Sequence, residues 1–181
     1  MITRRTFLAS AAAVPIVGFG QQQPVEPVSA KFPPRLKPGD LVNIVAPAGA
    51  ATSPESVVAA TARLEGLGFK VQVGEHVLSR WGYLAGTDED RAADLNEAIA
   101  NPDVRGIFTL RGGYGVTRIL PLVDYEALRR DPKVVIGYSD ITALLNAITR
   151  KSRIVTYHGP VATSRFEGFE AEWFRRIVME P

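Results

Sequence analysis

The stretch VRGIFTLRGGYG, residues 104–115, sets the architecture: an apolar run ends in a loop with three glycines in four positions. A second such junction lies at residues 134–142, VVIGYSDIT, where an apolar run leads into a helical segment. Short β-branched runs bounded by turn residues are typical of buried parallel strands. Both stretches therefore predict strands whose carboxyl ends open directly into loops.

The same alternation of strands and helices continues outward from these junctions. Strands are predicted over residues 41–46, 69–73, 104–110, 134–136 and 154–157. Helices are predicted over residues 53–67, 87–101 and 140–149, with short helical pieces at 117–120 and 125–129. Strands that alternate with helices at this spacing indicate an α/β fold with a parallel sheet. We expect a Rossmann-like or flavodoxin-like domain over residues 31–165, with helices on both faces of the sheet.

Composition excludes several classes of protein. The 181 residues are 46% hydrophobic and 22% charged, which is ordinary for a globular chain and excludes disorder. The absence of cysteine excludes disulfide scaffolds, Cys-ligated zinc and thiol catalysis. A net charge of +2 is too small to indicate a nucleic-acid partner.

Residues 1–30 have the character of an export signal. Arg4 and Arg5 precede an apolar run that Pro15 interrupts, and small residues follow at 28–30. The pattern predicts a cleaved leader, and residues 3–9, TRRTFLA, resemble the bacterial twin-arginine motif. An ordinary secretory leader with a chance arginine pair is the alternative. We expect an exported protein, periplasmic or associated with the cell wall, with no stable membrane insertion after the leader is removed.

The two junctions are the candidate sites, because ligands bind at the carboxyl ends of parallel strands. The glycines after residue 111 allow backbone amides to approach a phosphate or an oxyanion, but a tight turn explains them equally well. No phosphate-loop lysine follows. Ser139 has the position of a strand-to-helix nucleophile, although spacing alone favours Ser139 or Asp140 as a helix cap.

Five motifs together resemble the LD-carboxypeptidase family of serine peptidases, which includes muramoyltetrapeptide carboxypeptidases. They occur in family order as LKPGD (36–40), YLAGT (83–87), RGGYG (111–115), GYSDIT (137–142) and HGP (158–160). The resemblance implies that Ser139 is the nucleophile and that the amides of Gly113 and Asp140 form the oxyanion hole. It further implies a substrate site that involves Arg111, Gly112, Tyr114 and His158.

The implied reaction releases the terminal D-alanine from peptidoglycan tetrapeptide stems through an acyl-enzyme, with no metal or organic cofactor. The family draws a base Glu and His from a second, C-terminal domain. Neither His76, which we expect at the surface, nor His158, which lines the cleft or is structural, matches that histidine.

The last residues also suggest a missing neighbour. Residues 172–180 predict an amphipathic helix whose apolar side has no evident partner in the chain. We therefore expect residues 166–181 to lead toward an absent catalytic domain, and the chain alone to have little peptidase activity. The resemblance leaves a homodimer open.

Three other functions compete with this interpretation. One is an immunity-type peptidase that acts on peptide–nucleotide conjugates, with the same fold and nucleophile. Another is an exported muropeptide-binding module without catalysis. The third is a nucleotide-binding α/β domain, which the absent lysine disfavours.

Overall fold

The computed structural model describes residues 29–180, so the predicted leader falls almost entirely outside the described residues. Its sheet has five parallel strands in the order β2-β1-β3-β4-β5. The strands are β1 (Leu41–Val45), β2 (Lys70–Val73), β3 (Val104–Thr109), β4 (Val134–Gly137) and β5 (Tyr157–His158). The predicted α/β fold is thus confirmed, with the strand order of the flavodoxin-like type.

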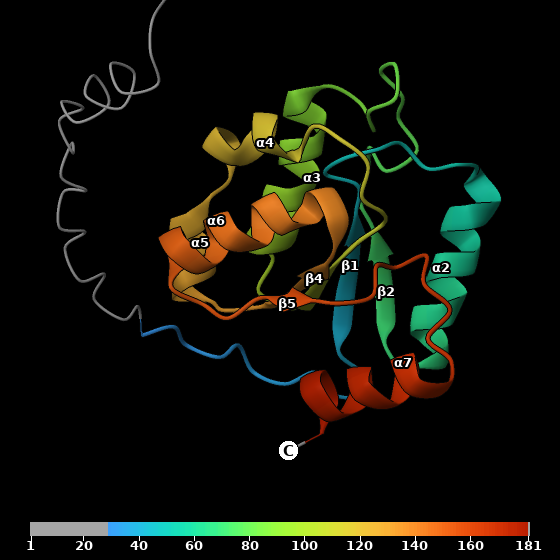
Figure 1. Cartoon of the computed structure of the whole chain (residues 1–181), viewed down its shortest axis with the longest axis vertical. Helices are drawn as coiled ribbons and strands as arrows, with labels where there is room; N and C mark the ends of the chain where they lie inside the picture. Colours follow the sequence, from blue (N-terminus) through green and yellow to red (C-terminus); the bar gives the residue numbers. More distant parts are fainter. Residues whose placement is uncertain (1–28, 181) are drawn as a thin grey trace, which may run out of the picture.

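Helices cover both faces of the sheet (Figure 1). On one face α2 (Pro54–Gly66) and α7 (Gly168–Phe174) pack on inward side chains such as Phe108 and Ile136. The opposite face, with Ile107 and Val135, is covered by α3 (Asp88–Ala100), α4 (Val116–Ile119), α5 (Tyr125–Arg130) and α6 (Thr142–Ser152). Because β1, β3 and β4 are buried on both faces, they consist mainly of continuous apolar runs.

Local capping chemistry starts the two longest helices. The Ser53 hydroxyl accepts from the Ser56 amide, and the Ser56 hydroxyl in turn accepts from the Ser53 amide. Thr87 and Asp90 form the same reciprocal pair at the start of α3. Each pair satisfies amides that a helix start leaves free, which fixes where the helix begins.

The last strand is shorter and later than predicted. The sequence predicts a strand over 154–157, but β5 contains only Tyr157 and His158, which pair with the last two residues of β4. Ile154 instead forms a single bridge with Lys31, from the segment that precedes β1. Lys31 donates to the Arg153 carbonyl and accepts from the Val155 amide, so this part of the chain pairs with the segment before β1, and β5 begins only at Tyr157.

The prediction that the C-terminal helix lacks a partner is wrong for half of its apolar side. Phe174 and Val178, the latter in the π-helical turn Arg175–Met179, are buried in the core of this domain. The Phe174 ring lies 5.9 Å from the Phe108 ring and 5.3 Å from the Phe166 ring. Trp173 and Ile177 do remain exposed. The helix is therefore part of this fold.

His76 also differs from the expectation of a plain surface residue. It is half-buried, and its Nδ1 lies 2.7 Å from the carboxylate of the buried Asp94, which also accepts from the His76 amide. This contact raises the pKa of His76, with the hydrogen bond to Asp94 as the main cause. Across residues 29–180, no helix has the length and apolar character needed to span a membrane.

Candidate active site

Three loops meet where the strand order reverses between β1 and β3. They follow β1, β3 and β4, so all of them leave the carboxyl edge of the sheet. A cavity of about 640 Å³ lies among them. It is lined by Thr52, Ser56, Ala59, Arg63, Leu110, Arg111, Gly112, Gly113, Tyr138, Ser139, Val161 and Thr163. Both predicted junctions therefore contribute to one site, as expected for a parallel α/β sheet.

Ser139 has an unusual backbone conformation. It is the first residue of the 3-10 turn Ser139–Ile141, directly after β4 and Tyr138, and its φ is +64°. Left-handed backbone at a residue other than glycine costs about 1–3 kcal/mol and is concentrated at functional sites. Gly137 makes the sharp turn possible, since a Cβ there would lie 2.4 Å from the Thr109 hydroxyl oxygen. The turn thus holds the exposed serine at the carboxyl edge of the sheet.

The glycine-rich loop lies directly against Ser139. A Cβ on Gly112 would come within 3.0 Å of the Ser139 Cβ and 3.3 Å of its hydroxyl oxygen. Gly113 has a φ of +140°, and a Cβ there would lie 3.0 Å from the backbone nitrogen of Gly49. The loops after β1 and β3 therefore touch backbone to backbone, which only glycine allows.

The amides of Gly113 and Asp140 donate to no protein acceptor within residues 29–180. Gly113 lines the same cavity as Ser139 and follows Gly112, which packs against the serine, and Asp140 is the next residue of the chain after Ser139. Free amides beside a hydroxyl can stabilise negative charge on an oxygen bonded to it.

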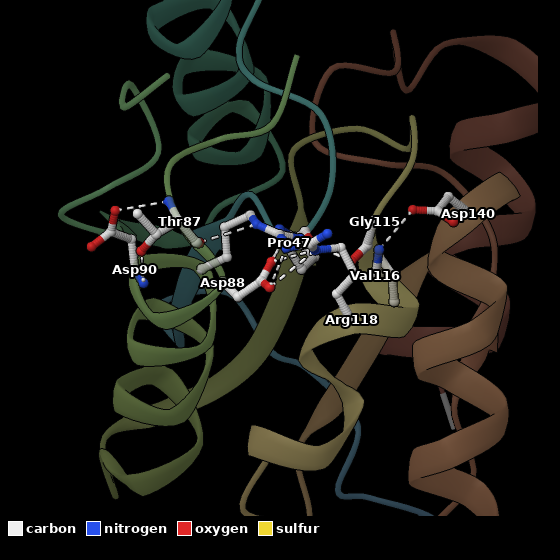
Figure 2. Close-up of polar contacts among 9 residues, drawn as sticks. Pro47, Thr87, Asp88, Asp90, Gly115, Val116, Arg118 and Asp140 are labelled. Atoms are coloured by element: carbon white, nitrogen blue, oxygen red, sulfur yellow. Dashed lines mark hydrogen bonds and ion pairs between the residues drawn. The ribbon is translucent and has the colours of Figure 1, made fainter. Parts of the chain in front are cut away.

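The alternative that Ser139 or Asp140 caps the following helix is wrong. Neither the 3-10 turn nor α6 has a side-chain cap. Instead the Asp140 carboxylate accepts from the Val116 amide, at 3.1 Å, at the start of α4 (Figure 2). Asp140 thus links the serine turn to the end of the glycine-rich loop, a contact between residues 24 positions apart.

A buried arginine donates hydrogen bonds to two of the loops around the site. Arg91 is 1% exposed, and its Nη1 donates to the carbonyls of Pro47 at 2.6 Å and Gly115 at 3.1 Å. Its Nη2 is paired with Asp88, which also binds Arg118 at 2.7 Å. These cations, Arg118 first, hold the pKa of Asp88 below its ordinary value.

Sequence reasoning missed Arg91. The available signal was its position on α3, four residues before the buried Leu95, where an apolar side chain is the usual choice. Arg91 fixes the ends of two loops whose amides and carbonyls surround the site, so it acts as a positioning residue.

The remaining predicted residues are divided among neighbouring cavities. Arg111 and Gly112 line the Ser139 cavity, whereas Tyr114 lines a second cavity next to it. His158 lines a separate apolar groove together with residues of α7, and its ring centre lies 6.4 Å from that of Tyr138, which lines the Ser139 cavity. Among the described residues that line the Ser139 cavity there is no carboxylate and no histidine.

Comparison with known proteins is consistent with this geometry. The model of the LD-carboxypeptidase N-terminal domain matches residues 42–159. The murein tetrapeptide carboxypeptidase of Pseudomonas aeruginosa is 44% identical over 124 residues, 67% of this chain and 39% of that protein. The microcin C7 self-immunity protein MccF of Escherichia coli is 39% identical over 103 residues, 57% of this chain and 30% of its own length.

Among solved structures, an MccF-like protein from Bacillus anthracis superposes with a TM-score of 0.77 and 35% identity. That match covers 82% of this chain and 47% of the other. The chain spans about two fifths of the length of the curated relatives it matches.

Proposed function

The chain belongs to the LD-carboxypeptidase family, and from this premise we propose that it carries the nucleophile of a serine carboxypeptidase that releases D-alanine from peptidoglycan tetrapeptide stems. The observation that carries the proposal is the left-handed backbone of Ser139, packed against Gly112 at the carboxyl edge of the sheet. Arg153 and Phe166 share the left-handed backbone, but Ser139 combines it with a place at the carboxyl end of β4 and in the lining of the cavity. A nucleophilic serine at a strand-to-helix junction uses such a strained turn to lift its hydroxyl toward a bound carbonyl.

In the proposed reaction the Ser139 oxygen attacks the carbonyl that precedes D-alanine. The hydroxyl proton passes to a base, and the negative charge on the tetrahedral oxygen is held by the amides of Gly113 and Asp140. Collapse breaks the C–N bond, the amine of D-alanine leaves with a proton, and the acyl-enzyme is hydrolysed by water. Each amide contributes about 3–4 kcal/mol to such a transition state when it is well aligned.

The mechanism needs a general base, and none of the residues from 29–180 that line the Ser139 cavity is a carboxylate or a histidine. The family resemblance implies a Glu and a His from a second domain, and the matched segment spans only 43% and 41% of two of the relatives. We therefore expect slow or no turnover by the 181 residues alone, while the serine and its oxyanion amides remain in place.

A peptide boronic acid tests the proposal without requiring a base from the protein. In this probe the boron replaces the scissile carbonyl of the stem peptide. The Ser139 oxygen bonds to boron, its proton passes to water or buffer, and a stable tetrahedral anion results. We expect the ¹¹B NMR signal of a tetrahedral adduct with the chain. Ser139→Ala should abolish it, and Ser164→Ala, on a half-buried loop outside the lining of the cavity, should leave it unchanged. An adduct that survives in Ser139→Ala, or no adduct with the unaltered chain, refutes the proposed nucleophile.

The similarity to MccF supports a second candidate, an immunity-type peptidase that acts on peptide–nucleotide conjugates. Both candidates share Ser139, and the substrate separates them. The predicted twin-arginine leader supports export, where stem peptides of the cell wall are the available substrate. Location of the protein by cell fractionation, with and without Arg4→Lys and Arg5→Lys, tests this part of the proposal.

A further inference from the structure

A second cavity of about 420 Å³ adjoins the Ser139 cavity. The two share Thr52, Arg111 and Gly113, so they are contiguous along one side of the glycine-rich loop. The second cavity is otherwise lined by residues 49–51, Arg80, Tyr83 and Tyr114. Its charged groups are therefore two arginines, and no carboxylate in the described part of the chain is among its lining residues.

Backbone carbonyls of one loop hold both guanidinium groups. Arg111 Nη1 donates to the carbonyl of Ala50 at 3.4 Å, and Arg80 Nη2 donates to the carbonyl of Ala51 at 3.2 Å. These are consecutive carbonyls of the loop after β1. Two cations that line one cavity without a carboxylate among its described residues make that cavity positive, which favours an anionic ligand there.

Neither arginine forms an ion pair within residues 29–180, in contrast to Arg91, Arg105, Arg118, Arg129 and Arg176. A guanidinium has five N–H donors in a planar fork that matches a carboxylate. Because each of the two arginines donates to one backbone carbonyl, most of its N–H groups remain available to a ligand. The rings of Tyr83 and Tyr114, 6.0 Å apart and edge to face, border the same space and limit its width.

The position of Arg111 connects this cavity to the reaction. Arg111 lines both cavities, and Ser139 lines the first. In a peptide the carboxylate of the last residue lies one residue beyond the scissile carbonyl, a separation of about 3.8 Å between consecutive Cα atoms. A substrate whose carbonyl lies over Ser139 can therefore place its terminal carboxylate near Arg111.

We propose that Arg80 and Arg111 bind the free α-carboxylate of the residue that is released. The inference rests on the proposed function and deepens it, because it makes these two residues the reason why the enzyme cleaves at a chain end. A peptide that continues beyond the released residue, or whose terminus is amidated, lacks the anion that fills the site and leaves the two guanidinium groups unneutralised.

Equilibrium binding to the Ser139→Ala chain tests the subsite without turnover. The probes are the D-alanine-terminated stem tetrapeptide with lysine in third place, and the same peptide with a C-terminal amide. The two peptides differ only in the terminal group, a carboxylate in one and a neutral amide in the other. We expect the acid to bind about tenfold or more tighter than the amide, as is typical of charge-assisted hydrogen bonds.

Arg80→Gln and Arg111→Gln should each reduce this preference, and the double variant should abolish it while the affinity for the amide stays unchanged. Arg111→Lys keeps the charge but loses the fork, so it should retain part of the preference. Arg150→Gln, which alters an exposed arginine on α6, is the matched control and should behave like the parent.

Equal binding of acid and amide by the parent, or a preference that survives in the double variant, overturns the subsite and leaves the proposed nucleophile standing. Binding of neither peptide overturns the subsite and the proposed peptide substrate together. Thermal unfolding of each variant shows whether a loss of binding comes from misfolding. Because the Arg80 side chain is exposed to solvent, we expect Arg80→Gln to disturb the fold least.

Discussion

The carboxylate of Asp140 accepts a hydrogen bond from the amide of Val116 at 3.1 Å, and this contact joins the turn that holds Ser139 to the end of the glycine-rich loop. The same residue offers its own amide beside Ser139. In the proposed mechanism Asp140 therefore has two roles: its amide is one of the two oxyanion donors, and its carboxylate holds the end of the loop that contains Gly113, the other donor.

Replacement of Asp140 by alanine should destabilise the protein by about 1 kcal/mol, because the first amide of α4 loses its acceptor. Urea unfolding measures this loss. Asp140→Asn keeps an acceptor at the same place and should recover most of the stability. Equal losses in the two variants would contradict the capping role.

A methyl group on Gly112 should weaken formation of the boronate adduct more than it weakens the fold. The new Cβ would lie 3.0 Å from the Ser139 Cβ, so the serine or the loop must shift. A displacement of about 1 Å at a reacting group costs roughly 100-fold. Gly66→Ala, on α2 with no atom within 4 Å of the new Cβ, is the control and should leave adduct formation unchanged. Titration of both variants with the boronic acid compares them directly.

Arg91→Met should destabilise the protein by about 3 kcal/mol or more, since it leaves the carbonyls of Pro47 and Gly115 without their donor. Arg118→Gln removes the more exposed partner of Asp88 and should cost less than about 1 kcal/mol. Denaturant unfolding gives both values. If Arg91 positions the two loops, Arg91→Met also weakens boronate binding under conditions where the variant is fully folded. Unchanged boronate affinity would reduce its role to stability alone.

The contact between His76 and Asp94 should make stability depend on pH near neutrality. The pKa of His76 in the folded protein is raised above its ordinary value of 6.5, chiefly by the hydrogen bond to Asp94. Its stabilising contribution is therefore fully present below about pH 6.5 and is lost as pH rises through the raised pKa. The difference in unfolding free energy between the parent and His76→Gln, measured from pH 5.5 to 9, should shrink as pH increases. A difference that grows or stays constant would show that the neutral imidazole makes the contact.

The sequence alone determined the features that depend on neighbouring residues. Strand and helix types follow from the spacing of apolar side chains, and the starts of α2 and α3 follow from Ser53 and Thr87, whose partners lie three residues away. The parallel sheet and the meeting of two junctions at one edge follow from the alternation of strands and helices. These interactions are local, so the pattern is visible in the order of residues.

Tertiary structure decided the features that join distant residues. Spacing favoured Ser139 or Asp140 as a cap of the next helix, yet Asp140 caps α4, which lies 24 residues earlier. Phe174 is buried because Phe108 and Phe166 arrive beside it from other segments, and Arg91 is buried because Pro47 and Gly115 offer carbonyls there. Arg80 and Arg111, 31 positions apart, line one cavity and donate to consecutive carbonyls of the loop after β1. No property of one segment specifies its partner across the sheet, because that choice depends on how the assembled strands and helices satisfy buried polar groups and fill the core together.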